Sequence, residues 1–138
     1  MKRFNRVLPL AVFIWIIMGI FISGYALAGG VPPCIAERNI DKLIASEAAL
    51  TDFSCTFKKF EGTEVLHFNV AIKNVSNNPQ RFRVHIFLDN GKAVGGLIPR
   101  KTKGGLVEPG QTASFEYPVN GMIGLPGEIL LKISTVTP

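Results

Sequence analysis

Residues 64–89 read EVLHFNVAIKNVSNNPQRFRVHIFLD, and this stretch decides the fold. Apolar side chains alternate with other residues in two runs, at positions 66, 68, 70 and 72 and again at positions 82, 84, 86 and 88. This period is typical of strands that are buried on one face. Ser76-Asn77-Asn78-Pro79 supplies turn residues between the runs, so we expect a two-stranded ribbon. Such a ribbon is not stable alone in water, and a second sheet must cover its apolar face.

The first 28 residues have the composition of an export signal. A basic start with Lys2, Arg3 and Arg6 is followed by an apolar run over residues 7–25. Ala26-Leu27-Ala28 then offers the small residues that a signal peptidase reads, and we expect cleavage before Gly29. The general secretory route would deliver the protein to the periplasm or the cell exterior. The alternative is an uncleaved membrane anchor, because the run approaches the ~20 residues that cross a bilayer.

The charge of the mature chain is small. Removal of the leader lowers the basic count from 15 to 12 against 10 acidic residues, so the formal net charge falls from +5 to +2. This value is too low to indicate nucleic acid or anionic lipid as a partner. We therefore expect contact with a membrane only through the leader, if it is retained.

Cys34 and Cys55 are the two cysteines of the chain, and both follow the leader. An even cysteine count in an oxidising compartment favours a disulfide between them. The loop that it closes is short, and the chain-entropy relation gives a stabilisation of about 3 kcal/mol. A metal pair or a redox dithiol would instead use Cys-x-x-Cys or clustered histidines, and the sequence contains neither pattern.

The mature chain divides into an extension over residues 29–50 and a domain over residues 51–138. Ile40, Leu43, Ile44 and Ala48 have helical spacing, so one short helix before the first strand is expected, with an irregular segment as the alternative. Residues 51–60 alternate again, with Cys55 on the inward parity. Turn residues then recur at positions 61–63, 90–91 and 108–111.

Three further strands are expected beyond the second apolar run. They cover residues 92–98, weakened by Gly95-Gly96 and therefore an edge strand or a bulge, then 113–117 and 128–136. Between the last two lies a loop, 118–127, whose apolar residues are expected to tuck under the sandwich. Six or seven short strands with frequent turns predict an antiparallel two-sheet sandwich.

Two segments carry a resemblance to a known class of modules. Residues 68–76, FNVAIKNVS, and residues 107–118, VEPGQTASFEYP, resemble small exported bacterial modules of the immunoglobulin-like and fibronectin-III-like kind. In these modules an Asn-rich turn closes one hairpin and a Pro-Gly-Gln turn precedes a late strand. The resemblance covers about residues 51–136. It implies an immunoglobulin-like β-sandwich, and it says almost nothing about activity.

One surface stands out as a candidate binding site. Arg81, Arg83, His85 and Phe87 alternate outward on the second apolar run, and Arg100, Lys101 and Lys103 follow in a basic loop. An outward aromatic ring among arginines is typical of a protein interface, whereas a solvated face that protects an edge is the alternative. This pattern predicts a non-catalytic exported module, of the accessory-subunit type, that binds another exported protein or itself.

A periplasmic carrier of a small molecule or of a metal, copper or zinc, is the alternative function. It would use His67 and His85, both expected to face outward, with Glu64, Asp89 or Glu116 as further ligands. The sequence otherwise predicts no enzyme and no cofactor, because it lacks a Gly-x-Ser-x-Gly elbow, a phosphate loop and a readable nucleophile–base pair. Asn74-Val75-Ser76 matches the glycosylation sequon, which matters only in a host that glycosylates.

Overall fold

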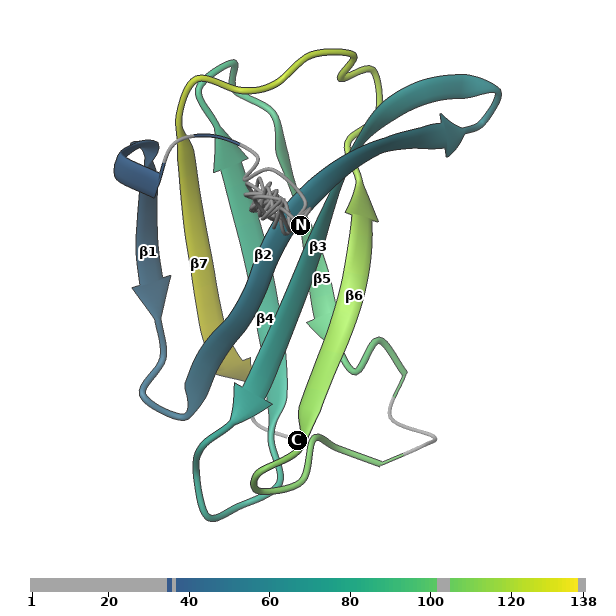
Figure 1. The fold of residues 1–138 in the computed structure, drawn as a ribbon. Coiled ribbons are helices and arrows are strands. Elements are labelled where there is room, and N and C mark those ends of the chain that lie inside the picture. Colours follow the sequence, from purple (N-terminus) through teal and green to yellow (C-terminus); the bar gives the residue numbers. More distant parts are fainter. Residues whose placement is uncertain (1–34, 36, 102–104, 137–138) are drawn as a thin grey trace, which may run out of the picture.

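The computed structural model describes residue 35 and residues 37–101 and 105–136. Within these ranges the chain consists of strands and their connections, with a single 3-10 turn, η1 (Glu37–Asn39), at the start. The strands, labelled in Figure 1, are β1 (Ile40–Ile44), β2 (Ala48–Phe60), β3 (Thr63–Asn74), β4 (Arg81–Leu88), β5 (Ala93–Ile98), β6 (Thr112–Pro118) and β7 (Ile129–Val136). No helix in these ranges is long and apolar enough to span a membrane.

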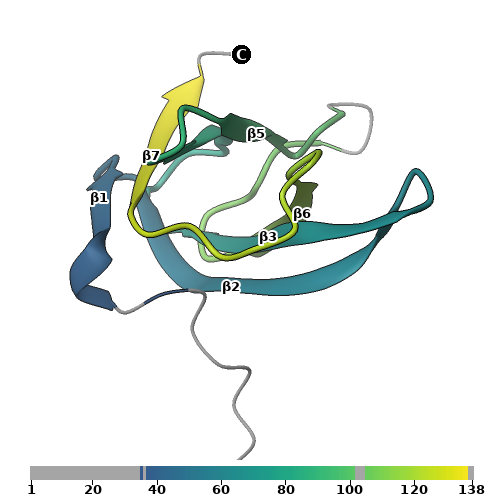
Figure 2. The ribbon, with the colours of Figure 1, turned by 90° about the horizontal axis from the view of Figure 1, so that it is seen from above.

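The strands form two sheets packed face to face. One sheet has four strands in the order β1-β7-β4-β5, and the other has three in the order β2-β3-β6. The view from above separates the two layers (Figure 2). The prediction of an all-β sandwich is therefore confirmed. The pairs are antiparallel except for β1 and β7, which run parallel, so the expected purely antiparallel arrangement is corrected at this edge.

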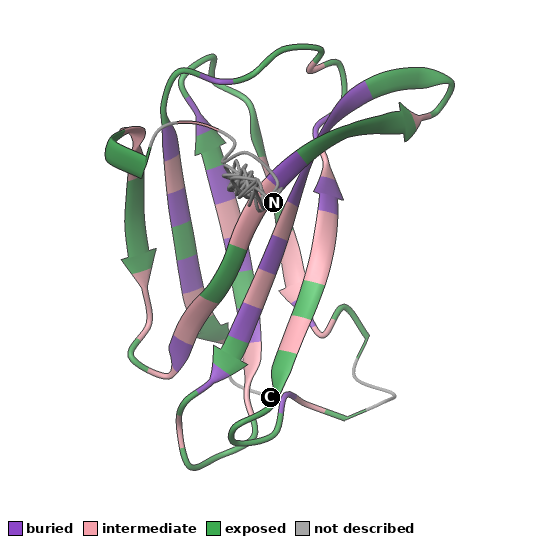
Figure 3. Cartoon of the chain, viewed as in Figure 1, coloured by how far each residue is buried: buried purple, intermediate pink, exposed green. Residues whose placement is uncertain are grey.

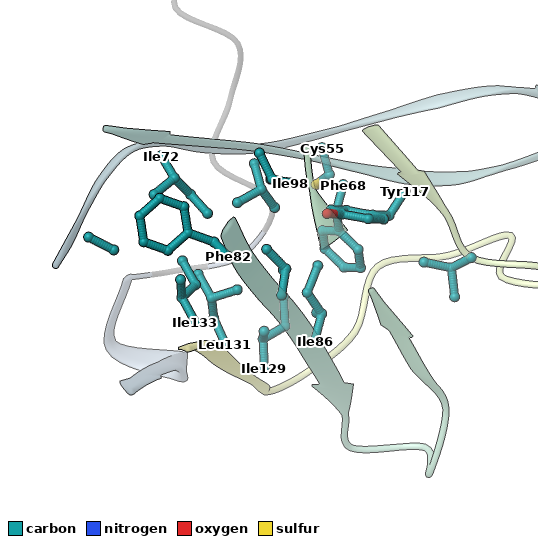
Figure 4. Close-up of a cluster of buried hydrophobic side chains, with 14 of the residues drawn as sticks. Cys55, Phe68, Ile72, Phe82, Ile86, Ile98, Tyr117, Ile129, Leu131 and Ile133 are labelled. Atoms are coloured by element: carbon teal, nitrogen blue, oxygen red, sulfur yellow. The ribbon is translucent and has the colours of Figure 1, made fainter. Parts of the chain in front are cut away.

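Alternation of burial follows the predicted parity. The eight apolar positions of the two runs, Leu66, Phe68, Val70, Ile72, Phe82, Val84, Ile86 and Leu88, are all buried, with at most 6% of each side chain exposed. Figure 3 shows the resulting bands of buried and more accessible residues along the strands. Side chains from both sheets meet in one core, part of which is drawn in Figure 4. The period-2 pattern therefore identified the inward face of both strands.

The predicted ribbon of these two runs is wrong, because β3 and β4 lie in different sheets. β3 pairs with β2 on one side and with β6 on the other, which leaves no edge for β4. The β2–β3 connection is a tight hairpin in which Glu61 and Gly62 both have positive φ, at 50° and 84°. Two such residues favour the primed turn that matches strand twist. Residues 75–80 instead carry the chain from one sheet to the other.

The predicted helix before the first strand is also wrong. Residues 40–44 form β1 and pair in parallel with β7, with Ile40 opposite Ile129 and Ile44 opposite Ile133. Ile40 and Ile44 pack against the core, whereas Leu43 is 56% exposed. A spacing of four residues fits one face of a helix and one face of a strand equally, so it could not separate them. The sandwich consequently begins before the predicted boundary at Thr51.

The turns and loops largely follow the prediction. Asn90-Gly91 closes the β4–β5 hairpin, and the Gln111 backbone N–H donates to the Glu108 carbonyl in the turn before β6. β5 is an edge strand, as expected. The loop after β6 differs in part, because Met122 packs against the core while Ile123 and Leu125 are 78% and 57% exposed. Those two side chains do not tuck under the sandwich.

Candidate functional site

The outer face of the four-stranded sheet brings several candidate residues together. Pairing of β4 with β7 sets His85 beside Lys132 and Phe87 beside Leu130, while Arg83 lies opposite Ser134. Leu43 of β1 lies next to Lys132 on the other side of β7. We call this surface the basic face; its members are Leu43, Arg83, His85, Phe87, Leu130 and Lys132. It combines three groups that can be cationic with three apolar side chains.

The basic face has exposed rings and unpaired charges. Phe87 is 42% exposed, and its ring centroid lies 5.8 Å from that of His85. Arg83 and Lys132 are exposed, and neither takes part in an ion pair within the described residues. β4, β5 and β7 contain no Asp or Glu. The carboxylates that border the face come from outside these three strands, since Asp41 of β1 is in register with Leu130 and lines a hollow beside Phe87 with Asp89 and Glu128.

Gly95 shapes the edge of this face. It lies opposite His85, and a shallow hollow over it is bordered by Arg83, His85, Ala93 and Leu97. A side chain at position 95 is excluded by close approach, because a Cβ there would lie 2.0 Å from the Val84 carbonyl oxygen. The side chains of Arg83 and His85 therefore border a shallow hollow whose base is the backbone of β5.

The remaining predicted residues of the surface are separated from it. Arg81 is half-buried and its guanidinium donates to the carbonyls of Pro99 and Arg100, at 3.1 and 2.9 Å. Arg81 thus anchors the segment after β5. The Arg100 guanidinium lies over the ring of Phe115, an inward-facing residue, with 5.4 Å from Cζ to the centroid. Lys101 is exposed, and Lys103 lies outside the described residues.

Lys132, Leu130 and Leu43 were missed by sequence reasoning. The alternation of β7 indicates that Leu130 and Lys132 face away from the core, so their exposure could have been predicted. Their position beside β4 could not, because pairing between strands more than 40 residues apart leaves no local signal in one sequence.

The outer face of the three-stranded sheet differs in its charges. Lys58 and Glu116 form an ion pair, with 2.7 Å between Nζ and Oε1, and Asp52 accepts hydrogen bonds from Asn69 and Ser54. Lys58 is in register with Val65 and Glu116 with Asn69, so the ion pair crosses β3 at the level of His67. The charges of this face are thus largely satisfied within the sheet.

His67 is buried, which corrects the expectation that it faces solvent. It retains 7% exposure beneath the Lys58–Glu116 pair, and the Phe60 ring contacts it edge-on at 6.2 Å between centroids. Its Nδ1 lies 2.9 Å from the Val65 carbonyl oxygen. Because a carbonyl can only accept, Nδ1 carries a proton and donates it. His67 is therefore a packed residue of the sheet.

The two histidines do not form a shared site. His67 belongs to β3 and His85 to β4, and each lies on the outer face of its own sheet, so the sandwich core separates them. The expected copper or zinc site that uses both residues is therefore excluded within one molecule. The described residues contain no group of three or more His, Cys, Asp or Glu side chains placed to hold a metal ion.

Cys55 faces the core, as its parity predicts, with 9% exposure. No free cysteine is found in the part of the chain that the structure describes. Cys34 lies outside those residues, so the Cys34–Cys55 disulfide stays a prediction. The export signal, residues 1–28, lies outside them as well.

Asn74, the sequon asparagine, is fully buried. Its amide nitrogen donates to the carbonyls of Asn78 and Val107, at 2.7 and 2.8 Å, and its oxygen accepts from the backbone and hydroxyl of Ser76. All hydrogen-bonding positions on the nitrogen are used, and solvent does not reach it. The folded chain therefore presents Asn74 as a structural residue that ties the end of β3 to two connecting segments.

Comparison with family models, with curated proteins and with solved structures gives no significant match to this chain. The two outer faces of the sandwich and the difference in their charges are therefore the features from which function can be inferred.

Proposed function

We propose that the protein is a non-catalytic exported module that binds the acidic surface of another protein through its basic face. The observation that carries the proposal is the contrast between the two outer faces. The three-stranded sheet carries both signs of charge, with Lys58 paired to Glu116, whereas β4 and β7 carry only cations and Arg83 and Lys132 have no acidic partner in the described residues. Unpaired cations around exposed apolar groups suit a complementary acidic partner.

Arg83, His85 and Phe87 form the centre of the proposed contact. Arginine and aromatic side chains are enriched among residues whose truncation weakens interfaces most, because they bury large areas and donate several hydrogen bonds. The sheet holds them on one rigid strand, with Phe87 already packed on His85. Binding therefore costs little side-chain ordering, which favours affinity.

A partner of different sequence fits this surface better than a second copy of the chain. Self-association by a two-fold axis would place one basic face against another. The facing cations would repel, because β4, β5 and β7 carry no carboxylate and the carboxylates that border the face, Asp41, Asp89 and Glu128, lie at its Phe87 end. Of the two expected partners, another exported protein and the same chain, the first is therefore favoured.

The other parts of the proposal rest on the sequence. Export is supported by the leader-like residues 1–28 and by the pair Cys34 and Cys55. A non-catalytic role is supported by the partners of the histidines, since neither His67 nor His85 hydrogen-bonds a nucleophile or a carboxylate among the described residues. The number of strands and their division into sheets of four and three support the immunoglobulin-like resemblance. The strand order, however, differs from that of an antibody constant domain.

Charge reversal on the basic face tests the proposal. The double substitution Arg83→Glu with Phe87→Ala is expected to weaken capture of the native partner by roughly 100-fold, because it removes an aromatic contact and places a repelling charge. The measurement is affinity capture from the native exported fraction, with retained proteins quantified by mass spectrometry.

Lys73→Glu is the matched control. Lys73 is exposed on β3, in the other sheet, so the same charge change is made away from the basic face. Its captured proteins are expected to equal those of the wild type. Equal loss of capture in both variants, or unchanged capture and size-exclusion profiles in the double variant, would overturn the proposal.

A further inference from the structure

A cleft of about 500 Å³ opens between the edge strands β5 and β6, where the two sheets meet. Phe115 and Tyr117 of β6 line it on one side, and Val94 and Leu97 of β5 line it on the other. Phe60 closes it from the β2–β3 hairpin, which extends beyond β6 (Figure 2). The volume falls within the range of small-molecule sites, about 300–1,000 Å³. The cleft adjoins the hollow over Gly95 along β5, but none of its lining residues belongs to the basic face.

Close packing of rings gives the cleft its shape. The rings of Phe115 and Tyr117 are tilted against each other, with 4.9 Å between centroids. Gly96 faces Tyr117, and a Cβ at Gly96 would lie 3.3 Å from the Tyr117 ring. A residue larger than glycine would therefore crowd the wall. Because Tyr117 is 3% exposed, the ring surfaces available to a ligand are mainly those of the half-buried Phe60 and Phe115.

Among the described residues that line the cleft, Arg100 is the only charged one. Its guanidinium lies over the ring of Phe115, with 5.4 Å from Cζ to the centroid, where cation–π attraction favours it. The in-plane N–H groups are left to donate, since the Arg100 side chain takes part in no ion pair within the described ranges. A planar guanidinium with free N–H groups matches a carboxylate in a bidentate arrangement.

We propose that this cleft binds a small amphipathic anion, with an apolar body between Phe60, Phe115 and Tyr117 and a carboxylate on Arg100. The positive charge of Arg100 favours an anionic ligand over a cationic one. Because no acidic side chain lines the cleft, an anion meets no repulsion and a cation meets Arg100 alone. This inference does not rest on the proposed function, because the cleft uses none of the cationic residues of the basic face.

Calorimetric titration of the purified full chain tests the site with a matched pair of probes. The anion 2-naphthoate and its neutral isostere 2-naphthamide share one apolar body and differ in charge. We expect 2-naphthoate to bind with a Kd below about 1 mM. Arg100→Gln is expected to weaken 2-naphthoate about tenfold and 2-naphthamide by less than about twofold, because the variant removes one charge-assisted contact.

Two further variants separate the parts of the site. Phe60→Ala is expected to weaken both probes by roughly fivefold, since it removes an apolar wall that both use. Lys101→Gln, which changes the adjacent exposed cation, should leave both Kd values unchanged. Thermal unfolding of each variant confirms that it is folded before titration.

The results that would contradict the anion site differ from the results that would contradict the proposed function. Absence of heat with 2-naphthoate at millimolar concentration, or equal weakening of both probes by Arg100→Gln, would overturn the cleft as an anion site. Loss of binding in Arg83→Gln with retention in Arg100→Gln would also overturn it, since the probe would then lie on the basic face. Partner capture by the basic face is measured separately and is unaffected by any of these outcomes.

Discussion

Tyr117 is buried between the sheets, and its hydroxyl has no hydrogen-bond partner among the described residues. Figure 4 shows the side chain directed into the interior of the sandwich. Burial raises the pKa of Tyr117 from 10.0 to about 12, and the positive charge of Arg100 opposes part of this effect. The neutral hydroxyl is therefore the form that the folded chain holds.

This burial predicts a loss of stability at alkaline pH. Between pH 10 and pH 12 the unfolded chain releases the Tyr117 proton while the folded chain keeps it, so the free energy of unfolding falls as pH rises. Below pH 10 the contribution is fully present. At pH 11 the loss from this residue is about 1.4 kcal/mol. Urea unfolding at pH 8 and pH 11 measures it.

The variant Tyr117→Phe isolates that contribution. The variant lacks the titrating group. Between pH 8 and pH 11 its free energy of unfolding should therefore fall by about 1.4 kcal/mol less than that of the wild type. At pH 8 it should be as stable as the wild type or up to about 1 kcal/mol more stable, because a buried hydroxyl without a partner is removed. Destabilisation beyond about 1 kcal/mol at pH 8 would contradict this account.

His67 and Asn74 mark the limit of sequence reasoning at the residue scale. Parity placed His67 on the outer side of β3 and the sequon placed Asn74 at a turn, and both residues are buried. His67 is covered by Phe60 and by an ion pair whose partners come from β2 and β6. Asn74 is held by carbonyls of two loops. The residues that cover His67 come from other strands, so the alternation of β3 could not reveal its burial. The inward parity of Asn74 indicates burial, but not its partner Val107, 33 residues away.

At the scale of the element, β5 depends on the close approach of its backbone to β4. Gly95 is in register with His85, and a Cβ at position 95 would lie 2.0 Å from the Val84 carbonyl oxygen and 2.8 Å from its carbon. The neighbouring atoms belong to the backbone of a central strand, which cannot move aside without loss of pairing on both edges. Glycine is therefore required there.

Gly95→Ala is expected to lower the free energy of unfolding by roughly 2–4 kcal/mol, because the methyl group forces β5 away from β4. Gly124→Ala is the matched control, since a Cβ at Gly124 meets nothing within 4 Å and its stability should change by less than about 0.5 kcal/mol. Denaturant unfolding of the two variants gives the comparison. Similar stabilities for both would show that β5 is not packed as described.

Strand faces could be predicted from the sequence, and strand partners could not. The period-2 pattern identified β3, β4, β6 and β7 together with their buried sides. It gave no information on pairing, so the two strongest strands were joined in one ribbon although they face each other across the core. The tight Glu61-Gly62 turn was the available signal that β3 pairs backward with β2. The parallel β1–β7 pair has no comparable signal.

At the scale of the whole molecule, the sandwich has two outer faces of different character. One carries both signs of charge and holds the Lys58–Glu116 ion pair, and the other exposes cations beside Phe87 without an acidic residue on β4, β5 or β7. The sequence predicted half of this site, namely the outward residues of β4. The other half comes from β7 and β1, which only the assembled sheet brings beside them.

Photo-crosslinking in native cells tests the role of the basic face most directly. The photoreactive amino acid p-benzoylphenylalanine is placed at position 87 of the basic face or at exposed position 56 of the opposite sheet. The account predicts a covalent adduct with a second protein from position 87, through an acidic segment of that protein, and none from position 56. Adducts from position 56 with none from position 87 would contradict it.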